Sequence, residues 1–245
     1  MKMFLNYYRI ILISFSICFF KTSILAEEVY KNLDELIAVV EDERSKYSFY
    51  VPEDFEGNIP WKIIRSVNSL NQVNLIRKFP RNESFAKECE YYKKWKKDMI
   101  SCEKSIQIHS SFEIPSREKI LISPYREIYL PSGTPSQIFI WVHSSNYNFK
   151  LKALISFKNR EALEADFGNL DFYGWKRLQA KITFQKDTRL NYSKNENFSL
   201  HGLLIEPNFG APKGSFQIYL DQIGILIIKP PEYPGSEIPD GWTRP

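Results

Sequence analysis

Residues 105–229 consist almost entirely of short strand-like segments separated by turns, and this rhythm restricts the fold more than any other feature. In Ile106–Ile114 and Phe149–Lys158, apolar side chains alternate with polar ones. Turn sequences such as PSGTP and NFGAPKG separate the segments. Several strands at near-regular spacing, with no long helical pattern between them, are typical of an antiparallel β-sandwich or barrel. We therefore predict one all-β domain.

The sequence on either side of this region is less regular. Leu33–Arg44 has apolar residues at helical spacing and predicts a short amphipathic helix, with a strand that ends in acidic residues as the competing interpretation. Tyr47–Ile64 alternates short aromatic and β-branched runs with turn residues, which favours strands. Residues 230–245 are rich in Pro and Gly and predict an extended C-terminal arm. The predicted sandwich domain therefore spans residues 27–229.

The first 26 residues have the pattern of a secretory signal peptide. A short basic segment precedes the apolar run Ile10–Phe20, and Ala26 supplies a small residue at the expected cleavage point. This run is roughly half the length that a membrane-spanning helix needs. An uncleaved apolar anchor and lipoprotein processing at Cys18 are the alternatives. We expect export, cleavage near Ala26 and no membrane span in the mature chain.

Removal of residues 1–26 also removes the apparent basic character of the chain. These residues hold Lys2, Arg9, Lys21 and no acid, so the formal net charge falls from +4 to +1. A nearly neutral exported chain has no electrostatic reason to bind nucleic acid. We therefore do not expect nucleic acid among its partners.

A dense run of lysines and aromatic residues, the Lys/aromatic insertion, occupies about residues 85–104. Cys89 and Cys102 flank its centre and are the only cysteines after residue 26, which predicts a disulfide bond worth about 3 kcal/mol in an exported protein. Aromatic rings beside cations suit contact with a partner protein, whereas an exposed insertion that its lysines keep soluble is the simpler interpretation. The candidate contact residues are Tyr91, Tyr92, Lys93, Lys94, Trp95, Lys96 and Lys97.

The sequence contains no recognisable catalytic or metal-binding constellation. The three histidines, His109, His143 and His201, lie far apart and none has another at ligand spacing. No P-loop, dinucleotide fingerprint, calcium loop or nucleophile elbow is present. Asp166 and Asp171 suit turns more economically than an acid–base pair. We expect no enzyme activity, no cofactor and no metal.

The segment Phe167–Lys176, FGNLDFYGWK, is the most distinctive stretch of the chain. Gly168 and Gly174 permit backbone conformations that other residues resist. Trp175 directly after Gly174 indicates a strand that restarts with its ring packed down. We assign a structural role to Gly168, Phe172, Gly174 and Trp175.

The same segment also divides into core and surface positions. We predict that Phe167, Leu170 and Trp175 lie mostly in the core, because aromatic and aliphatic side chains of this size anchor a sandwich. Alternation along a strand should place Tyr173 and Lys176 apart from the buried set. These two residues are therefore candidates for surface contact with a partner.

Four stretches between about Ile120 and Ile228 share one further likeness: SPYREIYLPSG, QIFIWVHSSNYNFKLKALI, DFGNLDFYGWKRLQAKI and GSFQIYLDQIGILI. In these stretches the sequence resembles the spirochaete flagellar filament outer-layer proteins, the sheath proteins of periplasmic flagella. The resemblance implies a jelly-roll-type β-sandwich similar to carbohydrate-binding modules, and a structural role without catalysis in the periplasm. It also implies that the partners are flagellin subunits of the core filament and other sheath proteins, with self-association in the coat.

A carbohydrate-binding protein of the periplasm or secreted medium is the alternative function. In that case exposed aromatic residues such as Trp141, Tyr147 or Trp175 would stack on sugar rings. An exported esterase-like enzyme is a third interpretation.

Overall fold

The computed structural model describes residues 33–42, 46–57, 59–64, 72–77, 88–91, 93, 102–157, 162–183 and 198–229. The expected signal peptide, the C-terminal arm, Tyr92 and Lys94–Lys97 lie outside these residues. The elements in chain order are α2 (Leu33–Glu41), β1 (Tyr47–Glu53), β2 (Trp61–Ile64), β3 (Gln72–Arg77), β4 (Lys104–Phe112), β5 (Ile120–Pro124), β6 (Ile128–Tyr129), β7 (Thr134–Ser145), β8 (Phe149–Phe157), β9 (Leu163–Asn169), β10 (Tyr173–Lys181), β11 (Phe198–Pro207) and β12 (Gly214–Ile228). None of the described helices is long and apolar enough to cross a membrane.

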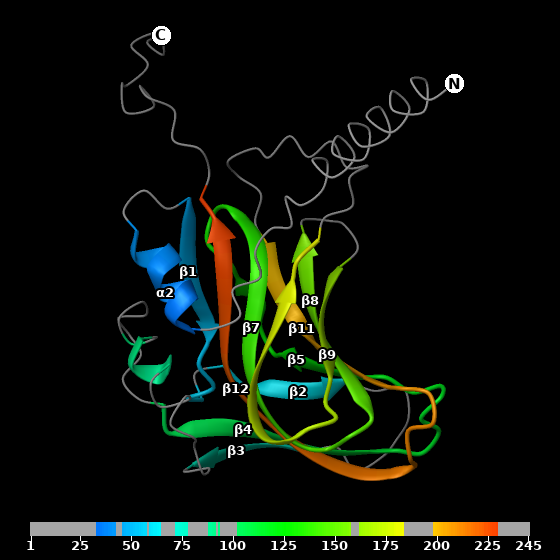
Figure 1. Cartoon of the computed structure of the whole chain (residues 1–245). Coiled ribbons are helices and arrows are strands. Elements are labelled where there is room, and N and C mark those ends of the chain that lie inside the picture. The colour runs from blue at the N-terminus through cyan, green and yellow to red at the C-terminus, as the bar shows by residue number, and fades with distance from the viewer. Residues whose placement is uncertain are drawn as a thin grey trace, which may run out of the picture. The chain divides into compact units, whose positions relative to one another are not determined.

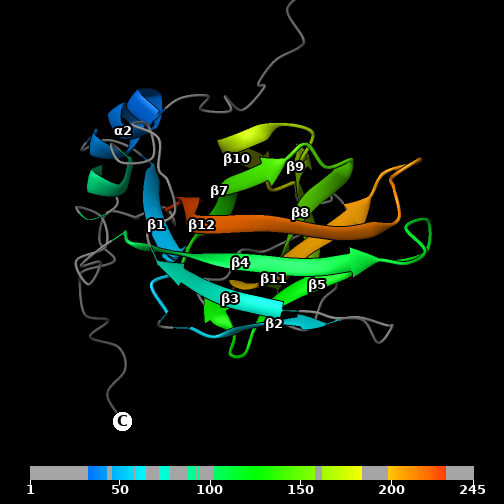
Figure 2. The same ribbon diagram turned by 90° about the horizontal axis from the view of Figure 1, so that it is seen from below.

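The described strands form two antiparallel sheets, which confirms the predicted all-β antiparallel sandwich (Figure 1). Sheet A has six strands in the order β10-β7-β12-β4-β3, with β1 also paired to β12. Sheet B has six strands in the order β2-β5-β11-β8-β9, with β6 also paired to β11. Figure 2 shows β12, β4 and β3 side by side. Most neighbours in both sheets are distant in sequence.

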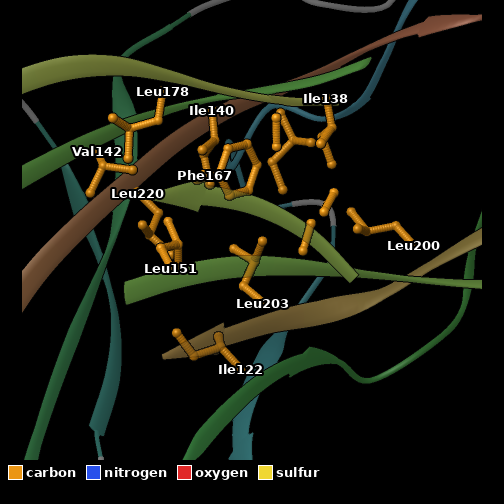
Figure 3. Close-up of a cluster of buried hydrophobic side chains, with 14 of the residues drawn as sticks. Ile122, Ile138, Ile140, Val142, Leu151, Phe167, Leu178, Leu200, Leu203 and Leu220 are labelled. Atoms are coloured by element: carbon orange, nitrogen blue, oxygen red, sulfur yellow. The ribbon is translucent and has the colours of Figure 1, made fainter. Parts of the chain in front are cut away.

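The main core lies between the two sheets (Figure 3). Ile138, Ile140 and Val142 of β7 point inward from sheet A, and Leu151 of β8 points inward from sheet B. Phe167 of β9 belongs to the same core, as predicted. Full burial of one such side chain contributes about 1.5–3 kcal/mol, so this cluster is the main source of stability.

The FGNLDFYGWK segment carries the chain from β9 to β10, and its glycines have the predicted backbone role. Gly168 and Gly174 have φ values of +89° and +82°. An added Cβ would meet nothing within 4 Å at either position, so the need for glycine is conformational and not steric. Leu170 between them is fully buried, and its amide donates to the carbonyl of Phe149 at 2.8 Å. The prediction that Leu170 lies in the core is confirmed.

The helical interpretation of the N-terminal segment is confirmed, and the alternative strand is wrong. Residues Leu33–Glu41 form α2, with Leu36 and Ile37 buried. The helix contacts β1, which Figure 2 shows beside it. Leu36 and Ile37 do not belong to the cluster between the sheets, so α2 contributes to a second apolar layer.

This second layer covers the outer face of sheet A. Phe139 and Trp141 alternate with the inward residues of β7, and yet they are only 0% and 4% exposed. The ring of Phe49 from β1 lies 6.0 Å from that of Phe139. Sheet A is therefore buried on both faces over much of its area.

Candidate functional site

Trp175 is not a core residue, contrary to the sequence prediction. Leu178 and Ala180 of β10 point into the core, so the odd-numbered Trp175 points to the outer face of sheet A, where it is half-buried. Its ring packs edge-on against His143, with 5.5 Å between centroids. Burial lowers the pKa of His143, which keeps this imidazole neutral near pH 7.

Tyr173 and Lys176 are both exposed, but alternation does not separate them from the buried residues in the way we predicted. Tyr173 has the parity of Trp175, and Lys176 has that of the core residues Leu178 and Ala180. Tyr173 is 79% exposed. The Nζ atom of Lys176 lies 5.2 Å from the ring centroid of Phe172, a side chain that packs partly against the core. The end of β10 therefore offers a phenol and an ammonium group to a partner.

The Lys/aromatic insertion is anchored on the covered face of sheet A. Cys89 and Cys102 are joined by a disulfide bond, and both are buried. Glu88 is buried beside them and pairs with Arg177 of β10. The interpretation of an exposed insertion therefore does not hold for Glu88, Cys89 and Cys102, because tertiary contacts bury them. Within it, Glu90 is exposed, and its carboxylate accepts a hydrogen bond from Lys93 at 2.8 Å.

Arg177 is the residue of this region that the sequence analysis missed. Its guanidinium carbon lies 4.4 Å from the ring centroid of Phe139, and its Nε faces Glu88. Arg177 lies two residues after Trp175 in β10, so its charge shares the outer face of sheet A with that ring. The acidic partner lies 89 residues earlier in the chain, so no local pattern could have identified it.

Two of the aromatic residues proposed as sugar platforms are unavailable for that role. Trp141 is buried under the second layer. The ring of Tyr147 stacks on Phe149 at 5.4 Å, and its hydroxyl oxygen accepts a hydrogen bond from the amide of Gln217 at 3.1 Å. Their roles are therefore structural.

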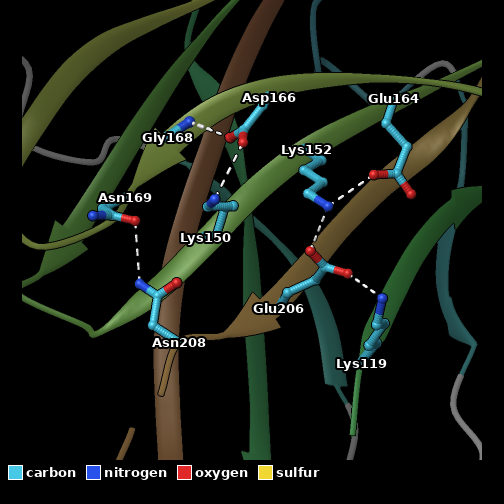
Figure 4. A network of polar contacts seen from close by, with 9 residues as sticks. All are labelled: Lys119, Lys150, Lys152, Glu164, Asp166, Gly168, Asn169, Glu206 and Asn208. Atoms are coloured by element: carbon cyan, nitrogen blue, oxygen red, sulfur yellow. Dashed lines mark hydrogen bonds and ion pairs between the residues drawn. The ribbon is translucent and has the colours of Figure 1, made fainter. Parts of the chain in front are cut away.

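The outer face of sheet B differs from that of sheet A, because charged side chains occupy it (Figure 4). Leu151, Ala153 and Ile155 of β8 point into the core, so Lys150 and Lys152 point outward. The Nζ atom of Lys152 lies 2.6 Å from Oε2 of Glu206 and 2.8 Å from Oε2 of Glu164. Lys119 pairs with the other oxygen of Glu206. We call Lys119, Glu206, Lys152 and Glu164 the charged row.

The two inner members of the charged row have shifted pKa values. Burial alone would lower the pKa of Lys152, but the hydrogen bonds and charges of Glu164 and Glu206 outweigh it and raise the pKa. Burial would likewise raise the pKa of Glu206, but Lys119 and Lys152 outweigh it and lower the pKa. Both groups are therefore held in their charged forms.

Asp166 and Asn169, at the start of the FGNLDFYGWK segment, border this row. Asp166 accepts a hydrogen bond from the amide of Gly168 at 2.8 Å, which is the local turn role that we predicted for it, and pairs with Lys150 at 3.3 Å. On the same face the side-chain Nδ2 of Asn208 donates a hydrogen bond to Oδ1 of Asn169 at 3.1 Å (Figure 4). These contacts join β9 to β8 and to the end of β11.

Apolar side chains accompany the charges on this face. Leu121 and Leu154 are half-buried, and Leu204 lies directly opposite Leu121 in the register of β11 and β5. Mutually paired charges and partly exposed leucines therefore share the outer face of sheet B. Among the residues that the structure describes, no group of three or more His, Cys, Asp and Glu could hold a metal ion.

One family model matches the chain. Its description is flagellar filament outer layer protein FlaA, and the match covers residues 95–229. No curated protein matches the sequence.

Several solved structures are similar to the chain at low sequence identity. The Family 11 carbohydrate-binding module of the cellulase Lic26A-Cel5E of Clostridium thermocellum is 11% identical, with 76% of this chain and 98% of that chain covered and a TM-score of 0.42. The CBM22-2 xylan-binding domain of Paenibacillus barcinonensis Xyn10C is 14% identical, with 71% and 96% covered and a TM-score of 0.35. The module CBM29_1 of Piromyces equi is 8% identical, with 77% and 96% covered and a TM-score of 0.34.

Proposed function

The chain belongs to the family of flagellar filament outer layer proteins, and from this premise we propose that it is a structural subunit of the sheath around the periplasmic flagellar filament. The match over residues 95–229 carries this proposal, because it spans β4 to β12 and hence most of both sheets. We propose flagellin subunits of the core filament and other sheath proteins as its partners.

The paired and buried carboxylates support a structural role. The charged groups of the sheet B face pair with one another, and the fully buried Asp221 accepts a hydrogen bond from the hydroxyl of Ser105 at 2.8 Å. Carboxylates that are held in this way stabilise the fold instead of acting on a substrate. The role that we propose is therefore that of a non-catalytic part of the filament that contributes to its shape and to motility.

Tyr173 and Lys176 are the described residues that we propose for contact with the filament. They stand toward one end of β10, where Tyr173 exposes a phenol and Lys176 an ammonium group, and tyrosine is enriched at protein interfaces. The insertion residues Tyr91 and Lys93 are half-buried. The rest of the proposed contact set, Tyr92, Lys94, Trp95, Lys96, Lys97 and the arm 230–245, lies outside the described residues.

Sedimentation with purified flagellar filaments tests this proposal. Wild-type protein should pellet with the filaments, and the double variant Tyr173→Ala/Lys176→Glu should pellet about tenfold more weakly. Tyr125→Ala is the matched control, because it removes another exposed tyrosine, on the loop after β5. Circular dichroism checks that each variant is folded.

Failure of the wild-type protein to bind filaments would contradict the sheath role. Folded wild-type protein that stays in the supernatant at every filament concentration, and that binds a defined glycan, would replace the sheath role with the carbohydrate-binding alternative. Loss of pelleting in Tyr125→Ala but not in the double variant would move the contact to sheet B.

A further inference from the structure

The four members of the charged row alternate in sign across four neighbouring positions of sheet B. Lys119 directly precedes β5, Glu206 lies on β11, Lys152 on β8 and Glu164 on β9, and these strands are adjacent in this order. The ion pairs run continuously from one end to the other (Figure 4). The row therefore reads plus, minus, plus, minus.

A row of this kind is complementary to its own reversed copy. Consider a two-fold axis in the plane of contact that crosses the row between Glu206 and Lys152. It places Lys119 opposite Glu164 of the second copy, and Glu206 opposite Lys152 of the second copy. Every charge then faces a charge of opposite sign, which is what a two-fold contact between identical patches requires.

We propose that the outer face of sheet B is the contact between two copies of this chain, related by a two-fold axis through the middle of the charged row. This inference goes beyond the sheath role, because it concerns the protein free in solution.

The exposure of the four side chains fits this arrangement. The end residues Lys119 and Glu164 are 63% and 48% exposed, and each has a single ion-pair partner within the described chain. The inner residues Glu206 and Lys152 are 15% and 17% exposed, and each is bonded on both sides. The inner pair therefore fixes the row, while the ammonium and carboxylate groups at its ends keep capacity for further bonds.

The neighbouring apolar side chains add contact area. Leu121 and Leu154 point outward on the same face, each partly exposed. Leu204 lies opposite both Leu121 and Lys152 in the sheet register, which places the leucines beside the row. In this arrangement the charged row lies at the two-fold axis and sets the register, and the leucines beside it add apolar contact area.

The charge pattern also argues against other occupants. The row and the adjacent pair Lys150–Asp166 together contain three positive and three negative groups. A partner with one sign of charge would meet repulsion from half of them. A second copy carries the alternating pattern that this face needs.

Sedimentation velocity of the purified chain over a range of concentrations tests the proposal. Wild-type protein should show a reversible monomer–dimer equilibrium. The variants Lys119→Glu and Glu164→Lys should each weaken dimerisation about tenfold, because each places two like-charge pairs across the two-fold axis. The neutral variants Lys119→Gln and Glu164→Gln should weaken it less and guard against misfolding of the reversed forms.

Two rescue experiments make the test specific. An equimolar mixture of Lys119→Glu and Glu164→Lys should form a mixed dimer of wild-type strength, and so should the double variant with itself. Within one chain the double variant puts like charges beside Glu206 and Lys152, so a rescue can arise only between chains. Lys213→Glu, an exposed lysine on the turn before β12, is the control for net charge.

Three outcomes would overturn the proposal. They are a monomer at every concentration, a dimer that single reversals leave unchanged, and single reversals that neither the mixture nor the double variant rescues. A monomeric protein that still pellets with filaments, and loses this binding on Lys119→Glu, would assign the sheet B face to the filament and leave the sheath role intact.

Discussion

Arg177 and Glu88 form an ion pair beneath the surface of the molecule. The Nε atom of Arg177 lies 3.1 Å from Oε1 of Glu88, and only 11% and 2% of the two side chains are exposed. Charges buried to this extent are tolerated when an opposite charge lies close by, so the loss of one partner removes favourable electrostatics from the other.

We expect Arg177→Ala to lower the free energy of unfolding by about 3–5 kcal/mol, because it removes the cation that faces the buried Glu88 carboxylate. Urea denaturation followed by circular dichroism measures the change. The double variant Arg177→Met/Glu88→Leu should recover much of the loss, and the exposed neighbour Lys176→Ala should cost less than 1 kcal/mol. An equal cost for Arg177→Ala and Lys176→Ala would contradict the buried pair.

The disulfide bond gives a second prediction. Cys89 and Cys102 are 13 residues apart, so removal of the bond in Cys89→Ser/Cys102→Ser should cost about 3 kcal/mol in the chain-entropy model. Urea denaturation with and without reductant measures this free energy. The reductant should lower the stability of the wild type by a similar amount and leave that of the variant unchanged. Recovery of two alkylatable thiols from native protein would refute the bond.

The glycines separate two mechanisms of destabilisation. Gly174→Ala should cost about 1–2 kcal/mol, because only the left-handed backbone at φ +82° opposes the new side chain. Gly202→Ala should cost more, because its Cβ would lie 2.5 Å from the backbone oxygen of Ile122 and push β11 away from β5. Thermal unfolding of the two variants shows which substitution destabilises the protein more. Gly210→Ala, on the turn after β11, is the control for the effect of a positive φ alone. A smaller effect at Gly202 than at Gly174 would be inconsistent with this packing.

The charged row should make stability depend on pH at both extremes. The pKa of Glu206 is lowered in the folded protein, so its contribution is present above its unfolded pKa of about 4.3 and disappears as the pH falls through the folded value. The pKa of Lys152 is raised, so its contribution is present below about 10.4 and disappears as the pH rises through the folded value.

The variant Glu206→Gln isolates the acidic side of this dependence. The difference in unfolding free energy between wild type and variant should be constant from about pH 6 to 9 and shrink below about pH 4, where protonation removes the wild-type charge. Urea unfolding at a concentration that keeps the protein monomeric gives this difference. A gap that stays constant down to pH 2 would show that Glu206 does not depend on its charge.

The sequence predicted most elements of the fold because their signals are local. The alternation in β4 and β8, the spacing in α2 and the glycines at positive φ each depend on residues within one segment. Trp175 was misassigned because an aromatic side chain signals burial but does not tell which face of a strand is buried. The run QIFIWVHSS in β7 did hold the missing information, since a strand that is apolar on both faces is typical of one buried on both sides.

The charged row and the pair of Arg177 with Glu88 could not have been predicted in this way. Lys119, Lys152, Glu164 and Glu206 come from four separate segments, and only the antiparallel register brings them together. The arrangement of charges on the outer face of sheet B could therefore be identified only from the three-dimensional structure.

The anchored ends of the Lys/aromatic insertion have a mechanical consequence. Cys102 leads directly into β4, while Glu88, next to Cys89, holds Arg177 of β10. Strands β7 and β12 lie between β10 and β4 in sheet A. One covalent bond and one ion pair thus strap the edge strand β10 to a strand three positions away. A pulling force on the insertion is therefore transmitted to both β10 and β4, so that the edge strand does not carry it alone.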